Sequence, residues 1–518
     1  MSRKMNKFIM RAVPILLLCL FPSLVCGKMA QLHEAQAVAE NWIQFVLERD
    51  GQWGEERKPS LGPMAELRWG DVLLGYYAPV QPEGYIVVSS LQNFAPIKAY
   101  STDSHLDPSK EGGMAAMLKD DLEGRAKFLM RVYGGLDDVS LEKFDKGTPQ
   151  STRMLWSYLL DGRELSANLG SIRKDSRGQV GPLLETSWDQ GPPYNDDCPD
   201  MGCGFAFNDN ALVGCVPLGL AQIMRYFCWP PYFDWHYDWP NMLNRYVYDS
   251  GSNWFNDEQG NPVTQAQIDA VADLCRDPGT VIHIEYGCSS TGAYMCNWYY
   301  DDARDALEDH FFYSNPSWDE PVCEERDSYD FPEWWDMIVW EIDHNRPMLF
   351  KLANSGGSFN HLVVIDGYDD TGGQTHVHAN YGWDDAHTTW YALDSLDCDS
   401  APGFQGGCEL GEYELVRYIY PRTAIPNHGT LGPRNSVTDL HHYVYTDEDN
   451  CFDLIVEGGA WVQFLPETSL SCYLDSVAIY GRSPDETRFY SEGLPTRGMK
   501  VAANGEIKLW PGGGMRVH

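Results

Sequence analysis

A short basic stretch at residues 171–178 (SIRKDSRG) constrains the fold more than any other feature, because it divides the chain into parts of different composition. The stretch is polar and has the character of an exposed, protease-sensitive connector. The chain has 518 residues, more than one hydrophobic core usually serves, so several domains are expected. We place one domain at residues 28–177 and a second, rich in aromatic residues and cysteine, at 178–423.

The N-terminus has the pattern of a signal peptide covering residues 1–27. Four basic residues precede an apolar run at residues 13–25, and Gly27 supplies the small residue at the expected cleavage point. The run is too short to span a bilayer comfortably, and Val25 is bulky where a lipoprotein signal has a small residue before its cysteine. We therefore expect a secreted, extracellular protein without membrane contact after signal removal.

The spacing of apolar residues predicts an α+β fold. In the first domain, helices are expected at 30–48 and 113–133, around strands within 84–100. In the second, the predicted helices follow residue 215 and cover 265–275 and 334–344, and the predicted strands cover 347–352, 361–367, 376–381 and 389–393. Helices followed by a sheet is an α+β order. A linker at 424–433, containing proline and glycine, precedes a small β-rich module at 434–518.

Cys215 stands directly before a predicted helix whose first turn holds Pro217, where a missing amide proton does no harm. The thiol then faces the positive end of the helix dipole, which is expected to lower its pKa and to raise the thiolate fraction. A nucleophile is the interpretation that we pursue. For Cys215 considered alone, the alternative is a structural cysteine packed under the helix.

His361 opens the apolar strand predicted at 361–367, so its imidazole is expected at the edge of the sheet. Thiol proteases need a base on a rigid strand opposite a helix-borne thiol, since the proton must cross a hydrogen bond and then reach the leaving amine. A metal site at His376 and His378 is the rival hypothesis, because the two alternate along the next strand. No third ligand has a metal-like spacing, so neither a metal nor another cofactor is expected.

Several separated motifs in one order resemble the streptopain family of cysteine peptidases. They lie at residues 188–195 (WDQGPPYN), 214–226 (GCVPLGLAQIMRY), 285–290 (EYGCSS), 361–367 (HLVVIDG) and 378–383 (HANYGW). The resemblance implies a papain-like peptidase domain cut from a larger precursor, with Cys215 and His361 as catalytic dyad. It also implies that Gln190 stabilises the oxyanion together with the backbone amide of Cys215, which suits an uncharged donor.

The resemblance suggests further site residues and also shows departures from the family pattern. Asn380 is expected to orient the imidazole and Trp383 to shield it from water. Substrate is expected to contact Ser290, Gly292 and Asn360. The family has tryptophan at the position of Tyr381, Gly-Gly at that of Phe359-Asn360, and other residues at those of Cys288, Thr291 and Gly292.

The partners follow from the same reasoning. Protein or peptide substrates are expected, and residues 28–177, whose segment 80–101 resembles the family's pro-domain, are expected to act as an intramolecular inhibitor. The formal net charge of −37 argues against nucleic-acid binding. Two alternatives are a secreted binding or adhesion protein with an inactive peptidase-like domain, and a transglutaminase-like acyltransferase, against which Asn380 in place of an acid argues mildly.

Twelve of the 14 cysteines lie beyond the signal, in a compartment where disulfides persist. If Cys215 is the nucleophile, an odd number is left, so at least one further cysteine is expected outside an intramolecular disulfide. Proximity alone suggests the pairs Cys198–Cys203, Cys398–Cys408 and Cys451–Cys472, although spacing does not determine connectivity.

Overall fold

The computed structural model describes residues 28–420 with gaps, and beyond them the strands between Thr430 and Val517. The gaps before residue 420 are 111–112, 146–148, 164–166, 169–176, 230–236, 298–301, 312, 314–320, 354–359, 384–387 and 394–412. The predicted signal peptide and most of the predicted connector therefore lie outside the described residues.

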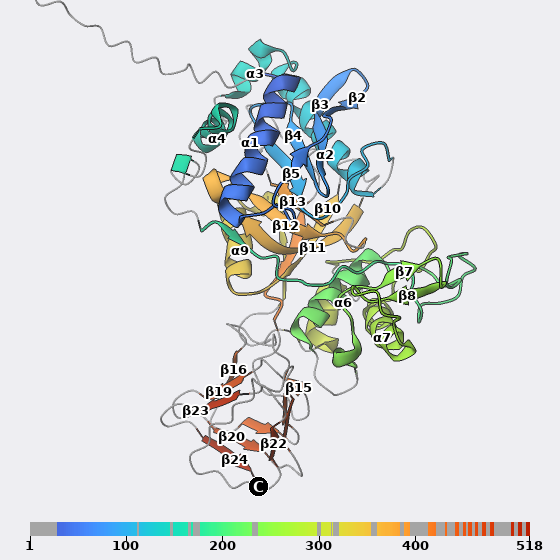
Figure 1. Ribbon diagram of the computed structural model, residues 1–518. Helices are drawn as coiled ribbons and strands as arrows, with labels where there is room; N and C mark the ends of the chain where they lie inside the picture. Colours follow the sequence, from blue (N-terminus) through green and yellow to red (C-terminus); the bar gives the residue numbers. More distant parts are fainter. Residues whose placement is uncertain are drawn as a thin grey trace, which may run out of the picture.

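One antiparallel sheet runs through both halves of residues 28–420 (Figure 1), in the order β1-β3-β4-β5-β13-β12-β11-β10-β14-β9, with β2 beside β3 and β6 beside β11. Its strands are β1 (Ser60–Leu61), β2 (Ala65–Trp69), β3 (Val72–Gln81), β4 (Tyr85–Ser89), β5 (Ile97–Ser101), β6 (Gln179–Val180), β9 (Val322–Glu325), β10 (Met348–Ala353), β11 (Asn360–Asp369), β12 (His376–Asn380), β13 (Thr388–Ala392) and β14 (Glu414–Arg417). The strands expected at 347–352, 361–367, 376–381 and 389–393 correspond to β10 to β13.

Helices cover both faces of the N-terminal part of this sheet. They are α1 (Leu32–Asp50), α2 (Gly113–Tyr133), α3 (Asp138–Asp145) and α4 (Gln150–Asp161), of which α1 and α2 confirm the predicted helices. In β4 the side chains alternate, so that Ile86 and Val88 pack with α1 and α4, whereas Tyr85 and Val87 pack with α2. Burial on both faces explains why this strand is an unbroken apolar run.

The helices α6 (Cys215–Phe227), α7 (Gln265–Val281), α8 (Ala303–Asp305) and α9 (Phe331–Asp343) belong to the second half, together with a hairpin of β7 (Val247–Asp249) and β8 (Trp254–Asn256). Helix α7 begins where expected, because Thr264 and Gln267 form a capping box, but it continues past the expected end at Cys275. Its extra turn holds Val281, which is buried in the same core as α6. The helices and the sheet confirm the α+β class.

The junction of the two halves was not predicted from the sequence. Strand β5 pairs with β13, placing Tyr100 opposite Trp390, so the sheet continues across the expected domain boundary. Beside this pairing, the buried ammonium group of Lys98 lies 3.0 Å from the Asp121 carboxylate and donates to the Ala392 carbonyl at 2.8 Å. The domains expected at 28–177 and 178–423 therefore share one sheet.

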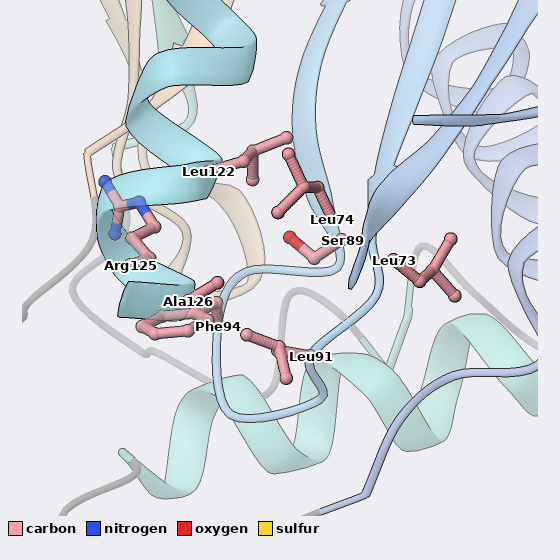
Figure 2. Close-up of a pocket in the computed structure, with 8 residues that line it drawn as sticks. All are labelled: Leu73, Leu74, Ser89, Leu91, Phe94, Leu122, Arg125 and Ala126. Atoms are coloured by element: carbon pink, nitrogen blue, oxygen red, sulfur yellow. The ribbon is translucent and has the colours of Figure 1, made fainter. Parts of the chain in front are cut away.

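A small apolar pocket lies inside the N-terminal half, between β3, the loop after β4, and α2 (Figure 2). It is lined by Leu73, Leu74, Ser89, Leu91, Phe94, Leu122, Arg125 and Ala126. None of these residues is a candidate site residue, so the pocket plays no part in the site described below.

The C-terminal segment forms three sheets of parallel strands (Figure 1). Its strands are β15 (Thr430–Leu431), β16 (His441–Val444), β17 (Asp449–Cys451), β18 (Leu454–Glu457), β19 (Trp461–Phe464), β20 (Ser469–Cys472), β21 (Val477–Tyr480), β22 (Met499–Val501), β23 (Glu506–Leu509) and β24 (Gly514–Val517). Strands β15, β16 and β17 enter three different sheets, and β18, β19 and β20 pair with them in the same order. The chain thus winds as a three-sided parallel coil.

Among the residues that the structure describes, no helix combines the length and the apolar character needed to cross a membrane.

Asp121 carries a buried charge at the junction of the two halves, where it accepts a hydrogen bond from the Tyr413 hydroxyl at 3.1 Å, and this leads to a stability prediction. Burial raises the pKa of its carboxyl, but Arg125 and Lys98 lower that pKa by more, so the group is held as a carboxylate. The substitution Asp121→Ala removes the carboxylate that pairs with the buried cations Lys98 and Arg125. We therefore expect the free energy of unfolding, measured by chemical denaturation, to fall by about 3–5 kcal/mol. The control is Glu123→Ala, which removes a partly exposed partner of Lys127 on the same helix and should cost under about 1 kcal/mol. Equal losses in the two variants would contradict this interpretation.

Candidate active site

Cys215 is the first residue of α6 and is half-buried. Gly214 before it has a φ of 93°, a conformation that residues with a Cβ atom rarely adopt. A Cβ atom at this position would lie 2.5 Å from Cδ1 of Ile284 and 2.7 Å from Oγ1 of Thr291. Glycine therefore lets the segment before the cysteine pass closely against the segment 284–292.

His361 lies near the start of β11, the strand against which α6 packs. The backbone amide of Leu362, the next residue, hydrogen-bonds to the thiol of Cys215. One turn into α6, Gly219 lies so close to the Leu362 side chain that an added Cβ atom would come 2.5 Å from Cδ2. The structure thus brings the helix N-terminus and the histidine strand together.

The buried imidazole of His361 has a defined orientation. Its Nε2 atom lies 2.9 Å from the Tyr381 carbonyl oxygen, which can only accept a hydrogen bond. In the neutral ring Nε2 therefore carries the proton, and Nδ1 has the lone pair that a base needs. Burial lowers the pKa of His361 to about 4, although the Tyr381 carbonyl raises it in part.

Aromatic rings cover His361. The Trp383 ring stacks on the imidazole, with 4.1 Å between centroids and 23° between planes, and the Tyr381 ring lies nearly parallel to it at 6.1 Å. Asn380 is not bonded to the imidazole in any contact described: its Oδ1 accepts from the Gly382 amide at 3.0 Å, and its Nδ2 donates to the Thr186 carbonyl at 2.8 Å. Asn380 thus braces the turn that carries the Tyr381 carbonyl and Trp383.

The expectation of a lowered pKa for the Cys215 thiol is wrong for this structure. Burial raises the pKa, and the backbone amides of Leu362, Val216 and Cys215 itself lower it by less. The net shift is upward because desolvation of the thiol outweighs the three backbone amides. The resting pair in the full-length chain is therefore thiol and imidazole, not thiolate and imidazolium.

Gln190 is tied to the segment that leads to the nucleophile. Its backbone carbonyl accepts a hydrogen bond from the Val213 amide at 2.9 Å, two residues before Cys215. The amide of the next residue, Gly191, donates a hydrogen bond to the Asp189 side chain at 2.7 Å. Gln190 and Cys215 thus lie on adjoining segments.

The residues predicted to bind substrate lie on two elements beside the dyad. Ser290 and Gly292 are exposed, on a loop closed by mutual backbone hydrogen bonds between Glu285 and Gly292 at 2.8 and 2.9 Å. Asn360 begins β11 and pairs with Ala353 of β10. Its side chain lies outside the described part of the structure.

The disulfides differ from those suggested by proximity. Cys203 is bonded to Cys288, not to Cys198, and Cys296 is bonded to Cys323. Proximity along the chain did not predict the pairing of Cys203, because folding brings distant loops together. The suggested pair Cys398–Cys408 lies outside the described residues, and of Cys451 and Cys472 only the backbone is described, as directly paired residues of β17 and β20. Cys198 and Cys275 are buried and outside the described disulfides, in keeping with the odd count.

His376 and His378 do not form a metal site in the part of the chain that the structure describes, where no group of three metal-binding side chains occurs. His378 lies 2.6 Å from the buried Asp366 carboxylate, which also accepts from the Leu184 amide at 2.9 Å. The Nε2 atom of His376 lies 2.8 Å from the Ile97 carbonyl oxygen of β5. Both histidines thus serve contacts within the fold.

Comparison with known proteins agrees with this geometry. Residues 188–391, which include Cys215, His361 and Gln190, match the model of the Peptidase C10 family. This segment is similar to the Peptidase C10 family. The resemblance to streptopain-type cysteine peptidases is thereby confirmed, and with it the papain-like α+β peptidase domain.

The matches to curated relatives extend beyond this segment. PrtT of Porphyromonas gingivalis, a thiol protease/hemagglutinin, is 25% identical over 471 residues, which are 87% of this chain and 48% of PrtT. Streptopain of Streptococcus pyogenes is 24% identical over 364 residues, which are 64% of this chain and 76% of streptopain. The chain thus spans about half the length of PrtT. A solved fragment of Prevotella intermedia prointerpain A is 20% identical with a TM-score of 0.45, and the match covers 70% of this chain and 99% of that fragment.

The sequence did not reveal two features of the C10 site. One is the carbonyl of Tyr381 as partner of His361, which a sequence motif cannot show because every residue has a carbonyl group. The other is the disulfide between Cys203 and Cys288, whose signal was present in Cys288, a cysteine at a position where the family pattern has another residue.

The raised thiol pKa leads to a prediction about the reactivity of the C10 nucleophile. In the full-length chain, we expect the rate of Cys215 alkylation by iodoacetamide to keep rising beyond the ordinary cysteine pKa of about 8.5. Because the pKa of His361 is lowered to about 4, the imidazole is neutral at higher pH and does not stabilise a thiolate by its charge. The measurement is mass spectrometry of the peptide containing Cys215, with the length of the intact chain checked at each pH. A rate plateau in the acid range, the mark of a thiolate–imidazolium pair, would contradict the prediction.

Proposed function

We propose that the protein is a secreted cysteine endopeptidase made as a zymogen. The observation that carries the proposal is the contact between the Cys215 thiol and the Leu362 amide, which sets the thiol at the start of a helix beside His361 within a C10 domain. A structural cysteine would not need the glycine that precedes it, nor an imidazole oriented by a backbone carbonyl on the adjacent strand. Proteins or peptides are the substrates.

In the proposed reaction, Nδ1 of His361 takes the thiol proton as Sγ of Cys215 attacks the carbonyl carbon of the scissile peptide bond. The tetrahedral oxyanion collapses to a thioester while the proton passes to the leaving amine. Water, deprotonated by the same imidazole, then hydrolyses the thioester and regenerates the thiol. The Tyr381 carbonyl supports these steps, since it holds the Nε2 proton and stabilises the imidazolium when it forms.

Gln190 is proposed to stabilise the oxyanion with the backbone amide of Cys215. Its hydrogen bond to Val213 supports this role, because the two segments are then fixed to each other. Ser290, Gly292 and Asn360 are proposed to contact substrate. Trp383 shields the imidazole, and Asn380 orients it through the turn it braces rather than by direct contact.

Residues 28–177 are proposed as the inhibitory pro-domain. Their strand β5 extends the sheet of the C10 domain, and their helix α2 begins beside the site, since a Cβ atom added to Gly113 would lie 4.0 Å from Cζ3 of Trp383. The similarity to a fragment named prointerpain A agrees with a precursor. The proposed pro-domain thus comes near the residue that stacks on the proposed catalytic base.

A binding or adhesion function with an inactive peptidase-like domain is the second candidate. The name of PrtT, which includes hemagglutinin, and the C-terminal coil of parallel strands favour a binding activity somewhere in such chains. The dyad geometry around Cys215 and His361 favours the peptidase. Binding by the C-terminal module and peptidase activity are compatible.

The peptidase proposal is tested by Cys215→Ala. We expect casein hydrolysis by the purified protein under mild reduction to fall by at least about a thousandfold, because the nucleophile and its base act as a unit. Cys228→Ala is the matched control, since Cys228 is a buried cysteine that ends the same helix and should keep most of the activity. Comparable activity in Cys215→Ala and in the wild type would refute the proposal.

The zymogen proposal is tested by N-terminal sequencing of the secreted protein. Arg177 and Gly178 donate backbone hydrogen bonds to Asp370 at 3.0 and 2.8 Å, and Val180 pairs with Tyr368, so the chain is held from residue 177 onward. We therefore expect the wild type to convert to a form that begins at or shortly after Ile172, whereas Cys215→Ala stays full length after signal removal. A mature wild-type protein that begins near Lys28 would make residues 28–177 a permanent domain.

A further inference from the structure

The Cys203–Cys288 disulfide joins the two segments that lie beside the nucleophile. Cys288 is on the loop 285–292, which carries the proposed substrate residues Ser290 and Gly292. Cys203 is on the segment 199–211, which runs on directly to Cys215. The covalent bond therefore connects the substrate loop to the approach of the catalytic helix.

The disulfide lies next to a second, non-covalent tie between the same segments. The Leu212 amide donates to the Gly287 carbonyl at 3.0 Å, one residue from Cys288. On the other side of the disulfide, the Cys203 amide donates a hydrogen bond to the Asp209 carbonyl at 3.0 Å. The Ala211 amide donates to the Pro199 carbonyl at 2.9 Å. The disulfide and the Leu212 bond together fix the loop at two adjacent points.

The tip of the loop lies at the surface. Residues 288–290 are exposed, whereas a buried element would be fixed by packing. Thr291, which follows the tip, lies directly against Gly214, the residue before the proposed nucleophile. A shift of the loop therefore changes the surroundings of Gly214 and of Cys215 after it.

We propose that the Cys203–Cys288 disulfide is a specificity-determining element of the cleft, so that full activity requires Cys215 as a thiol and Cys203–Cys288 as a disulfide at the same time. This inference rests on the proposed peptidase function. The crosslink pre-orders the substrate loop, and its loss makes each substrate bear the cost of ordering that loop on binding. The loss should raise KM and reduce discrimination among side chains next to the scissile bond, while the chemistry at Cys215 persists.

The reduction step is ordinary thiol–disulfide exchange. A dithiothreitol thiolate attacks one sulfur of the disulfide, the other sulfur leaves as a thiolate and takes a proton, and the second thiol of dithiothreitol then displaces the mixed disulfide. The products are two cysteine thiols and cyclic oxidised dithiothreitol. The exposure of Cys288 favours attack there over the Cys296–Cys323 bond, in which both residues are only partly exposed.

The test is a dithiothreitol titration of the protein that is secreted from the full-length chain and then processed. Activity is measured on peptides that differ next to the scissile bond, and the cysteines are assigned by alkylation and mass spectrometry at each point. We expect activity to rise as Cys215 becomes a thiol and then to fall, with kcat/KM for the preferred peptide reduced about tenfold through KM, as Cys203 and Cys288 become alkylated.

Two double variants separate specificity from folding. Cys203→Ser with Cys288→Ser should show the lowered kcat/KM at every dithiothreitol concentration and lose the falling phase. Cys296→Ser with Cys323→Ser, which removes the other described disulfide, should retain both phases. The fraction of molecules in which Cys215 can be alkylated measures the concentration of folded active sites in each variant. A variant that fails to fold therefore shows a lower concentration of active sites, whereas loss of specificity shows a higher KM.

The proposal is overturned if wild-type activity rises to a plateau that persists after Cys203 and Cys288 are fully alkylated. It is also overturned if the two double variants have the same kcat/KM and the same preference. Absence of activity in the wild type at every dithiothreitol concentration would instead refute the peptidase function, which distinguishes the two failures.

Discussion

The packing of helix α6 on strand β11 is the contact on which the site depends. Gly219 permits it, because a side chain there would collide with Leu362. The close approach brings the Leu362 amide to the Cys215 thiol and leaves His361 beside the helix N-terminus. The proposed dyad is therefore a product of one helix–strand interface, and the surrounding loops only complete it.

That interface belongs to a sheet that extends through both halves of the chain. The pairing of β5 with β13, the hydrogen bond from Lys98 to the Ala392 carbonyl, and that from the Tyr413 hydroxyl to Asp121 join residues 28–177 to the second half as parts of one core. Cutting the connector breaks one peptide bond and none of these contacts. An inhibitory domain joined in this way needs a second step, separation of two paired strands, before it leaves.

Much of this arrangement could be predicted from the sequence. Periodicity located α1, α2 and the strands β10 to β13, and the motifs singled out Cys215 and His361, because these features depend on neighbours in the chain. The continuous sheet, the Cys203–Cys288 bond and the raised thiol pKa depend on contacts between distant segments. Helix-dipole reasoning gave the wrong direction for the Cys215 pKa because it took no account of burial, which here has the larger effect.

The partner of His361 is a backbone carbonyl, and this has a consequence for how the site tolerates change. A carboxylate partner can be protonated in acid and can be lost through a single substitution. The carbonyl of residue 381 does neither, since it has no titratable proton and is supplied by every amino acid. A change of the side chain at residue 381 that keeps the path of the backbone therefore leaves the hydrogen bond that orients His361 unaltered.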